Sequence, residues 1–589
     1  MAETVDELKI RIRELEKEVA QWKSKVKNVR YGLNWLEIPE AFDRESEDKI
    51  PILEEVREKA VDAEGALAET PPHILIEGDN YHALTCLNYT HRGKIDVIYI
   101  DPPYNTGSDG FTYKDKRFLT EYPDGQKVPK DHPLRHSYWL SFMEKRLKLA
   151  KNLLSEKGVI FISIDDNEQA NLKLLCDKIF GEGNFVATIP WRKRTAKADV
   201  PYSLSQDYEW IICYAHSRFK AGIKKDSRKY YETEDLSGKP WRFHDLTKQT
   251  TVEERPKSNF TIVNPQTGDK YPVNPMRSWA ITSETFDKYY NEGRIIFPGD
   301  YDFLKISKPV LRYFKEDDEK KAGEHFGFTT ASTDLPKEVG MTQDGTKDMN
   351  ELFSSKVFLF PKPISLIHYL LKIATPLSSK ITILDFFAGS GTTLHATMKL
   401  NAEDGGHRQC ILVQQAEGKN NICENVTYER NRRVMQGYTN AKGEFVEGLG
   451  GRLKYYKTNF VGRHPSQNAS DADSVELANK AGCLIALAEN TLETVAVPES
   501  AKGFWQIYAN TETKKRYTCI YHNGDYERVP EFVATIDALR AADKKAKFAV
   551  YVFSWNSPDF FENEFDDLKN IEIKAIPKPI LEIYKALNG

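Results

Sequence analysis

The feature that most constrains the fold of this chain is an alternation that occurs in two separate stretches. In each stretch, short apolar runs of strand length alternate with segments in which apolar residues recur at helical spacing. In the first stretch the apolar runs are His73–Ile76, Ile95–Ile100 and Val159–Ile164. In the second stretch they are Ile381–Leu384 and Gln409–Gln414. Strands that alternate with helices along a chain pair mostly in parallel. The pattern therefore predicts an α/β fold with a doubly wound, largely parallel sheet assembled from two stretches.

The rest of the chain divides around these two stretches. A chain of 589 residues has room for about three or four domains. Between the stretches, turn-forming, aromatic and charged residues mix without the spacing of a strand or of a helix, which indicates an inserted domain. The expected segments are a coiled-coil helix at 1–30, an acidic linker at 31–70, a first core half at 71–189, an insert at 190–350, a second core half at 351–458 and a C-terminal α/β unit at 459–589.

The first thirty residues have the seam of a coiled coil. Their apolar side chains recur at alternating spacings of four and three, with Glu, Lys and Arg between them. An isolated helix of three heptads is marginal in water, so it needs a partner. A second copy of the chain and the body of the same chain both remain open, and the first would make a homodimer. The seam residues are Leu8, Ile12, Leu15, Val19, Trp22, Val26 and Val29.

Composition excludes several classes of protein. No apolar run approaches the ~18 residues that cross a bilayer, and the charged N-terminus has no signal-peptide core, so we expect a cytoplasmic protein. The 7 cysteines are scattered without a C-x-x-C pair, which argues against disulfide scaffolds and cysteine-rich zinc sites. The net charge of −4 argues at first against a nucleic-acid partner, but residues 191–260 carry 15 basic and 10 acidic side chains. The net charge therefore neither supports nor excludes a nucleic-acid partner.

The motif Phe387-Ala-Gly-Ser-Gly391 lies between a predicted strand and a predicted helix. Its glycines permit a tight turn and a close approach of a ligand to the backbone, and the helix N-terminus favours a negative group. It lacks the lysine of a P-loop and the third glycine of the dinucleotide fingerprint. Taken alone, a strand–helix turn that happens to contain glycine explains it as well. An acidic residue after the next strand would hold ribose hydroxyls, and Glu417 is the candidate.

The motif Asp101-Pro-Pro-Tyr104 follows another predicted strand. In open α/β sheets, ligands bind beyond the carboxyl ends of the strands. An acceptor carboxylate, the acceptor carbonyl of Pro102 and an aromatic face in four stiff residues suit a planar exocyclic amine. Its two hydrogens would bond to Asp101 and to the Pro102 carbonyl, while its ring stacks on Tyr104.

Together, the two motifs resemble those of amino-methyltransferases that use S-adenosylmethionine. Their order along the chain is similar to that of the β-class adenine-N6 DNA methyltransferases, and the chain most resembles the modification (Mod) subunits of type III restriction–modification systems. The stretches Leu75–Asn80 and Phe360–Pro363 with Leu366-Ile367 carry the same resemblance. It implies a Rossmann-like methyltransferase fold, with a target-recognition domain at 190–350.

The resemblance also implies roles for individual residues. Asp101, Pro102, Pro103 and Tyr104 would hold a flipped adenine, and S-adenosylmethionine would be the cofactor, with no metal required. The residues implied near S-adenosylmethionine are Asp79, Asn80, Lys362, Pro363, Asp385, Phe387, Ala388, Gly389, Ser390, Gly391 and Glu417.

The implied activity is sequence-specific adenine-N6 methylation of double-stranded DNA by base flipping. The resemblance implies a restriction (helicase–nuclease) subunit as a further partner, while a stand-alone methyltransferase fits the sequence equally well. Methylation of RNA or of a protein amide is an alternative, as is a non-catalytic DNA-binding subunit. The long insert favours duplex DNA, because sequence reading needs surface in the grooves.

A basic cluster at the start of the insert has two interpretations. Arg192, Lys193, Arg194 and Lys197, with Trp191 beside them, form either a solvated charge run or a group that grips DNA phosphates while Trp191 stacks on a base.

Overall fold

The structure is a computed structural model that describes most of the chain. The coiled coil expected at 1–30 lies outside the described residues. These are residues 33, 35–38, 49–107, 115–121, 126–130, 132–195, 204–224, 228–251, 253–376, 378–416, 421–510, 515–555, 558, 561, 564–565 and 570–588.

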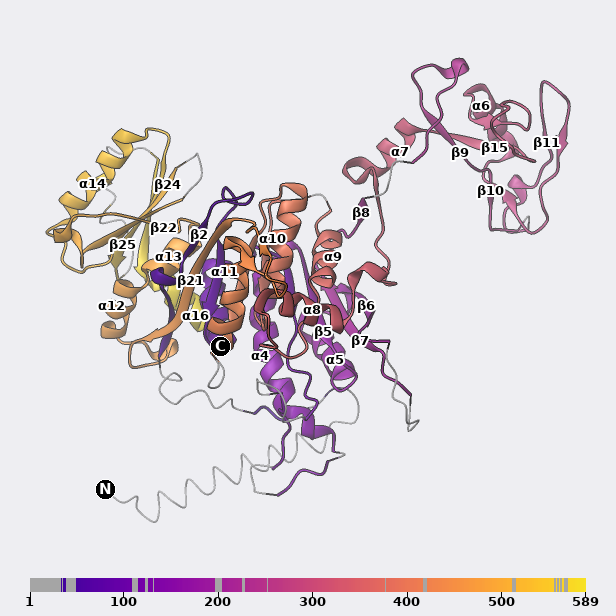
Figure 1. Cartoon of the computed structure of the whole chain (residues 1–589). Coiled ribbons are helices and arrows are strands. Elements are labelled where there is room, and N and C mark those ends of the chain that lie inside the picture. The colour runs from indigo at the N-terminus through magenta and orange to yellow at the C-terminus, as the bar shows by residue number, and fades with distance from the viewer. Residues whose placement is uncertain are drawn as a thin grey trace, which may run out of the picture. The chain divides into compact units, whose positions relative to one another are not determined.

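A ten-stranded mixed sheet forms the centre of the larger part of the protein (Figure 1). Five successive pairings, from β21 through β3, β18, β17 and β4 to β5, are parallel, and strands at both edges pair antiparallel. The predicted sheet is thus confirmed as a mixed α/β fold. In spatial order the strands are β1 (Ile50–Glu55), β21 (Gly451–Val461), β3 (His73–Glu77), β18 (Gln409–Gln414), β17 (Thr382–Asp385), β4 (Ile95–Ile100), β5 (Leu154–Ile164), β7 (Tyr208–Ala215) and β6 (Phe185–Arg192), with β2 (Val61–Ala63) also on β21.

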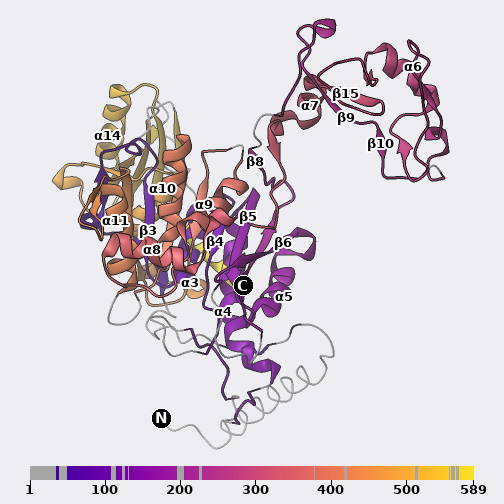
Figure 2. The same ribbon diagram turned by 45° about the vertical axis from the view of Figure 1, so that its right-hand side comes forward.

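Helices from both halves of the chain cover this sheet. α3 (Asn80–Thr90), α4 (Ser137–Leu153) and α5 (Gln169–Phe180) pack side by side, and α9 (Ile364–Ala374) packs on α10 (Thr392–Asp404). Figure 2 shows α9 and α8 (Thr342–Phe353) on one side of β4 and β5, with α4 and α5 on the other. The central strands are almost wholly apolar and buried because both of their faces are covered.

The structure corrects two expected boundaries. The segment expected as a linker at 31–70 contains β1 and β2, whose apolar side chains complete the edge of the sheet beside β21. The expected insert at 190–350 is too wide, because β7 pairs with β5 and β6 pairs with β7 in the main sheet, and α8 belongs to the same compact unit.

The insert itself is a separate compact unit, Gly222–Ala331. Its central sheet orders β14 (Ile295–Ile296), β15 (Val310–Phe314) and β9 (Trp241–Asp245), with α6 (Ser283–Asn291) and α7 (Lys315–Ala322) beside it. Buried Asp318 accepts hydrogen bonds from Arg228, Tyr230 and Arg242. The remaining two-stranded pairs are β8 (Ile223–Lys224) with β16 (Phe328–Thr329), β10 (Thr247–Lys248) with β13 (Ser278–Trp279), and β11 (Ile262–Val263) with β12 (Lys270–Tyr271).

The C-terminal segment forms a second, five-stranded sheet, as predicted from its strands and helices, but it shares its core with the rest of the larger unit. Residues of α13 (Gly482–Ala488) and α16 (Lys578–Asn588) lie in one apolar cluster with residues of α3 and β1. Tyr584 of α16 is fully buried, and its hydroxyl donates to the Pro51 carbonyl oxygen at 3.1 Å. The elements are α12 (Asp471–Lys480), α13 (Gly482–Ala488), β22 (Glu493–Val495), β23 (Trp505–Ala509), β24 (Arg516–Tyr521), α14 (Val529–Ala542), β25 (Lys547–Ser554), β26 (Ile571–Pro577) and α16 (Lys578–Asn588).

Three further elements complete the larger unit. α11 (Glu429–Gln436) lies against α10, and β19 (Tyr438–Thr439) pairs with β20 (Phe445–Val446). No helix among the described residues is long and apolar enough to cross a membrane.

Because α16 completes the core of the larger unit, Tyr584→Ala should lower its free energy of unfolding by about 3 kcal/mol through the cavity it leaves. Lys585→Ala, at an exposed position of the same helix, should change it by under about 0.5 kcal/mol. Denaturant unfolding followed by fluorescence measures both. Equal effects of the two substitutions would contradict the shared core.

Candidate active site

The two motifs lie at the carboxyl ends of adjacent strands. β4 and β17 pair in parallel, with Ile383 opposite Val97 and Leu384 opposite Ile98. Asp101 follows the last residue of β4, and Asp385 is the last residue of β17. The carboxyl ends of parallel strands meet at one edge of a sheet, so this pairing brings together two motifs from opposite sides of the insert in the sequence.

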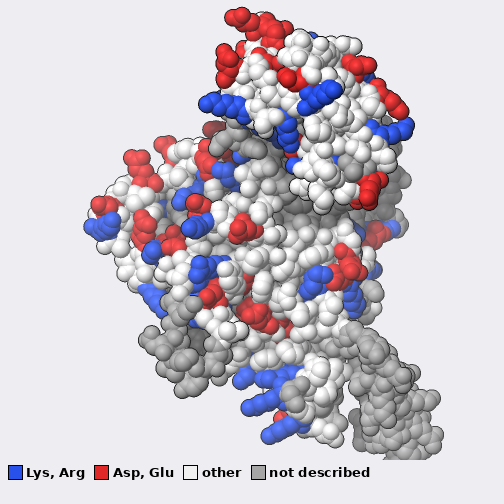
Figure 3. Space-filling view, turned by 90° about the vertical axis from the view of Figure 1, so that its right-hand side faces the viewer, with Lys and Arg blue, Asp and Glu red and all other residues white. Residues whose placement is uncertain are grey.

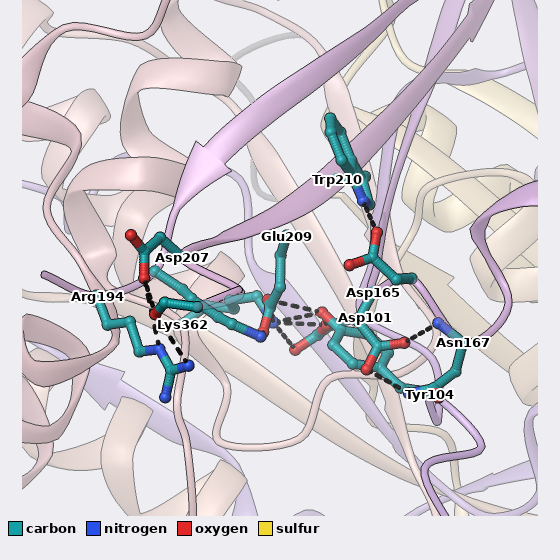
Figure 4. A network of polar contacts seen from close by, with 12 residues as sticks. Asp101, Tyr104, Asp165, Asn167, Arg194, Asp207, Glu209, Trp210 and Lys362 are labelled. Atoms are coloured by element: carbon teal, nitrogen blue, oxygen red, sulfur yellow. Dashed lines mark hydrogen bonds and ion pairs between the residues drawn. The ribbon is translucent and has the colours of Figure 1, made fainter. Parts of the chain in front are cut away.

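A buried lysine joins the Asp101 motif to the second half of the chain (Figure 4). The Lys362 ammonium donates to both carboxylate oxygens of Asp101, at 2.8 and 2.9 Å, and to the Tyr104 hydroxyl oxygen at 2.7 Å. The Tyr104 hydroxyl donates to Asp101 Oδ1 at 2.7 Å. Trp139 of α4 donates its indole N–H to the Pro103 carbonyl at 2.7 Å. This bond ties the Pro102-Pro103 pair to α4.

Glu209, the second residue of β7, completes this group, and no sequence motif marks it. Its Oε2 lies 3.4 Å from Lys362 Nζ and 3.1 Å from the Tyr104 hydroxyl. Its Oε1 lies 3.5 Å from Lys193 Nζ. Two carboxylates and two ammonium groups thus alternate at this edge of the sheet.

The charges of this group reinforce one another. Burial acts to lower the pKa of Lys362, but Asp101 and Glu209 outweigh it and raise that pKa above its ordinary value, so the ammonium stays charged. Burial and the same two carboxylates hold the pKa of Tyr104 well above its ordinary value. Tyr104 is therefore a neutral hydroxyl, able to donate to Asp101.

The glycine-rich turn is closely packed and partly buried. Gly389 and Gly391 have φ of 51° and 75°, the left-handed region that favours glycine. The Gly389 amide donates to Gln414 Oε1 at 2.7 Å. A Cβ on Gly391 would lie 2.5 Å from Asn431 Nδ2, so the turn fits closely against α11.

Two buried ionisable side chains hydrogen-bond with this turn and its flanking residues. Arg430 of α11 is fully buried and donates to Ser390 Oγ at 3.0 Å and to Thr392 Oγ1 at 2.7 Å; burial lowers its pKa to about 10. Among the described residues no carboxylate pairs with it. Burial also raises the pKa of Asp385 to about 7, although it accepts hydrogen bonds from Thr393 and the Phe387 amide.

Asp79 and Asn80 tie the turn after β3 to the glycine-rich turn. Asp79 caps α3 by accepting from the Tyr81 amide at 2.8 Å, and Asn80 Nδ2 donates to the Phe386 carbonyl at 2.9 Å. Buried Arg146 contacts both side chains. Their position at the same edge agrees with the expectation that they lie near the site, and their role at a cofactor stays a prediction. Glu417 lies outside the described residues.

The residues of the predicted basic cluster lie in different surroundings in the structure. Trp191 is 1% exposed and donates its indole N–H to the Gly340 carbonyl at 3.0 Å, so its ring is buried, and its stacking on a base stays a prediction. Lys193 faces Glu209, and Arg194 lies 3.9 Å from Asp207. Arg192 is exposed, while Lys197 lies outside the described residues. Figure 3 shows basic and acidic side chains interspersed over most of one face, with a group of Lys and Arg at its lower end.

Comparison with known proteins gives a consistent set of relatives. Residues 95–428 match the N6/N4 DNA methylase family. The StyLTI Mod subunit, a type III restriction-modification enzyme of Salmonella typhimurium (strain LT2), is 32% identical over 467 residues, 73% of this chain and 67% of that one. The EcoPI Mod subunit of Escherichia phage P1 is 33% identical over 391 residues, 59% of this chain and 58% of that one, so this chain spans less than two thirds of it.

Among solved structures, a putative DNA modification methylase from Thermus thermophilus, complexed with S-adenosyl-L-methionine, has a TM-score of 0.28 at 14% identity. The alignment covers 65% of this chain and 99% of that one. A TM-score this low supports no comparison of geometry.

The close fit of the glycine-rich turn predicts a measurable difference between two glycines of similar backbone. Gly391→Ala should destabilise the protein by about 2 kcal/mol or more, since it combines left-handed strain with a clash against Asn431 and Thr427. Gly405→Ala, at φ 67° with nothing within 4 Å of its Cβ, should lose only the ~1 kcal/mol of backbone strain. Denaturant unfolding measures both. If Gly405→Ala proved as costly as Gly391→Ala, the turn would not be held as described.

Proposed function

Because the chain belongs to the N6/N4 DNA methylase family, we propose that it transfers a methyl group from S-adenosylmethionine to the N6 amino group of adenine in duplex DNA. The observation that carries this proposal is the parallel pairing of β4 with β17, which sets an acceptor for a planar amine beside a glycine-rich turn. The Mod subunits among its relatives support a place in a restriction–modification system.

The glycine-rich turn fits the proposed cofactor. Left-handed glycines at 389 and 391 let a ligand approach the backbone, and the N-terminus of α10 together with buried Arg430 favours a carboxylate such as that of a methionyl group. Phe387, Ala388, Ser390 and Asp385 belong to the same turn. Asp79, Asn80 and Pro363 lie around this edge and are proposed as further contacts, as is Glu417.

S-adenosylmethionine supplies an electrophilic methyl group when bound, and the residues of the chain prepare the amine that takes it. The adenine N6 lone pair is delocalised into the ring, which makes it a poor nucleophile. Hydrogen bonds from N6 to Asp101 and to the Pro102 carbonyl would localise that lone pair and orient it for in-line transfer. The methyl group that bound S-adenosylmethionine would supply would leave its sulfur for N6, and the surplus N6 proton would pass to water.

Tyr104 would receive the flipped base. Its hydroxyl is anchored by Asp101 and Lys362, which holds the far end of its ring in place. A fixed aromatic ring is a stacking platform that offsets part of the few kcal/mol that base flipping costs.

The DNA and protein partners are further parts of the proposal. The compact unit Gly222–Ala331 would read the target sequence, and Arg192, Lys193, Arg194 and Lys197 would contact phosphates. A restriction subunit and a homodimer through residues 1–30 are proposed as protein partners, and the cytoplasm is the proposed location.

Purified protein, labelled S-adenosylmethionine and mixed-sequence duplex DNA test the activity directly. Label should enter the DNA, and after hydrolysis of that DNA it should be recovered as N6-methyladenine. Label found as N4-methylcytosine would reject the adenine assignment, and label entering only RNA or protein would reject DNA as the substrate. Failure to bind S-adenosylmethionine would favour a non-catalytic DNA-binding subunit. Long-read sequencing of DNA from expressing cells would then identify the methylated motif.

Asp101→Ala should reduce methyl transfer at least ~100-fold while S-adenosylmethionine still binds, because the substitution removes an acceptor from the amine and leaves the glycine-rich turn intact. Asp166→Ala is a matched control, since this exposed carboxylate follows β5 and contacts Trp210 instead. It should stay within about threefold of the wild type. Initial rates and equilibrium dialysis of the labelled cofactor give both quantities. Unchanged turnover of Asp101→Ala would reject the mechanism.

A further inference from the structure

The Lys362 ammonium lies where the proposed reaction needs the amine of the target base. It donates to both oxygens of Asp101 and to Tyr104, and its Nζ lies 5.0 Å from the centre of the Tyr104 ring. An ammonium, like an exocyclic amine, presents N–H donors to a carboxylate. The lysine therefore competes with adenine N6 for the same acceptor.

This competition strongly favours the lysine as long as it stays in place. A charge-assisted hydrogen bond is roughly twice as strong as one from a neutral donor. Lys362 is 9% exposed, and its ammonium remains charged beside two carboxylates. A neutral amine would gain little from Asp101 unless Lys362 moved off at least one of its oxygens.

Moving Lys362 away from Asp101 requires another acceptor, because an unpaired buried charge is strongly unfavourable. Glu209 is within reach: its Oε2 lies 3.4 Å from Nζ, somewhat beyond the ~2.7–2.9 Å of a charge-assisted bond. Its side chain is 13% exposed, and it already faces the Tyr104 hydroxyl. A small rotation of the lysine side chain would complete this pair and free Asp101.

We propose that Lys362 holds the place of the target amine on Asp101 in the DNA-free protein, and that Glu209 receives the ammonium when the base enters. Glu209 is then a positioning residue, which acts on the target base through Lys362. This inference rests on the proposed function and adds to it a step that precedes methyl transfer.

The proposal predicts that the effect of Glu209 depends on Lys362. In Glu209→Gln the ammonium loses its charged alternative and stays on Asp101, so KM for DNA should rise about tenfold with S-adenosylmethionine binding within twofold of wild type. In a Lys362→Met background there is no ammonium to relocate, so the same change should alter KM less than twofold. Glu209→Asp should recover part of the loss, because it keeps the charge.

The measurement uses duplex DNA with the methylated motif, for kinetics, and the same duplex with 2-aminopurine next to the target adenine, for base flipping. The 2-aminopurine fluorescence of Glu209→Gln should fall below that of wild type, whereas Lys362→Met should restore it. Thermal unfolding with S-adenosylmethionine checks that each variant folds. Should Lys362→Met not fold, Lys362→Gln serves as the uncharged background with the same expectation.

Two results would overturn the inference. One is a Glu209→Gln effect of equal size with and without Lys362, which would make the glutamate a purely structural residue. The other is a Glu209→Gln protein with wild-type KM and fluorescence. A wild-type protein that transfers no methyl group would instead overturn the proposed function, and the two failures are therefore distinguishable.

Discussion

The parallel pairing of β4 with β17 is the contact on which the rest of the site depends. Its partners come from opposite sides of the insert in the sequence, and each contributes an aspartate at or directly after its last residue. A shift of one residue in this register would turn every side chain to the opposite face, so the buried apolar faces of both strands specify it strongly. The Asn80 bond to the Phe386 carbonyl adds a polar tie at the same edge. Since none of these contacts uses Gly222–Ala331, that unit can vary without disturbing them.

The central strands are predictable from sequence, and the edges of the sheet are not. β4, β17 and β18 are apolar along almost their whole length because both faces are covered, and such runs are easily recognised. β1 lies in an acidic segment whose composition predicts a linker; only its pairing with β21 reveals it as a strand. β6 and β7 mix aromatic and charged residues, because strands near an edge need bury only part of their surface.

In the site, residues carried by local motifs are predictable, whereas their partners from distant segments are not. The turn around Gly389 is recognised through the spacing of its glycines, and the Asp101 motif through its two stiff prolines. Lys362 is expected at the cofactor, but its nearest partners are Asp101 and Tyr104, which no local pattern could indicate. Glu209 lies in a strand without a motif and has a role only because β7 lies beside β5. Because basic residues follow Trp191 in the sequence, its ring is expected at the surface, but in the structure the ring is buried.

The contrast between the two aspartates explains why a lysine lies in this site at all. Asp385 is buried, its donors among the described residues are neutral, and burial raises its pKa to about 7. Asp101, at the end of the next strand, has in Lys362 the cation that Asp385 lacks. Buried ion pairs seldom stabilise a fold more than apolar side chains of the same size would, so stability alone does not account for this pair. In the proposed reaction Asp101 would accept a neutral amine, for which the cation would have to be withdrawn, and Glu209 is a carboxylate in position to take it.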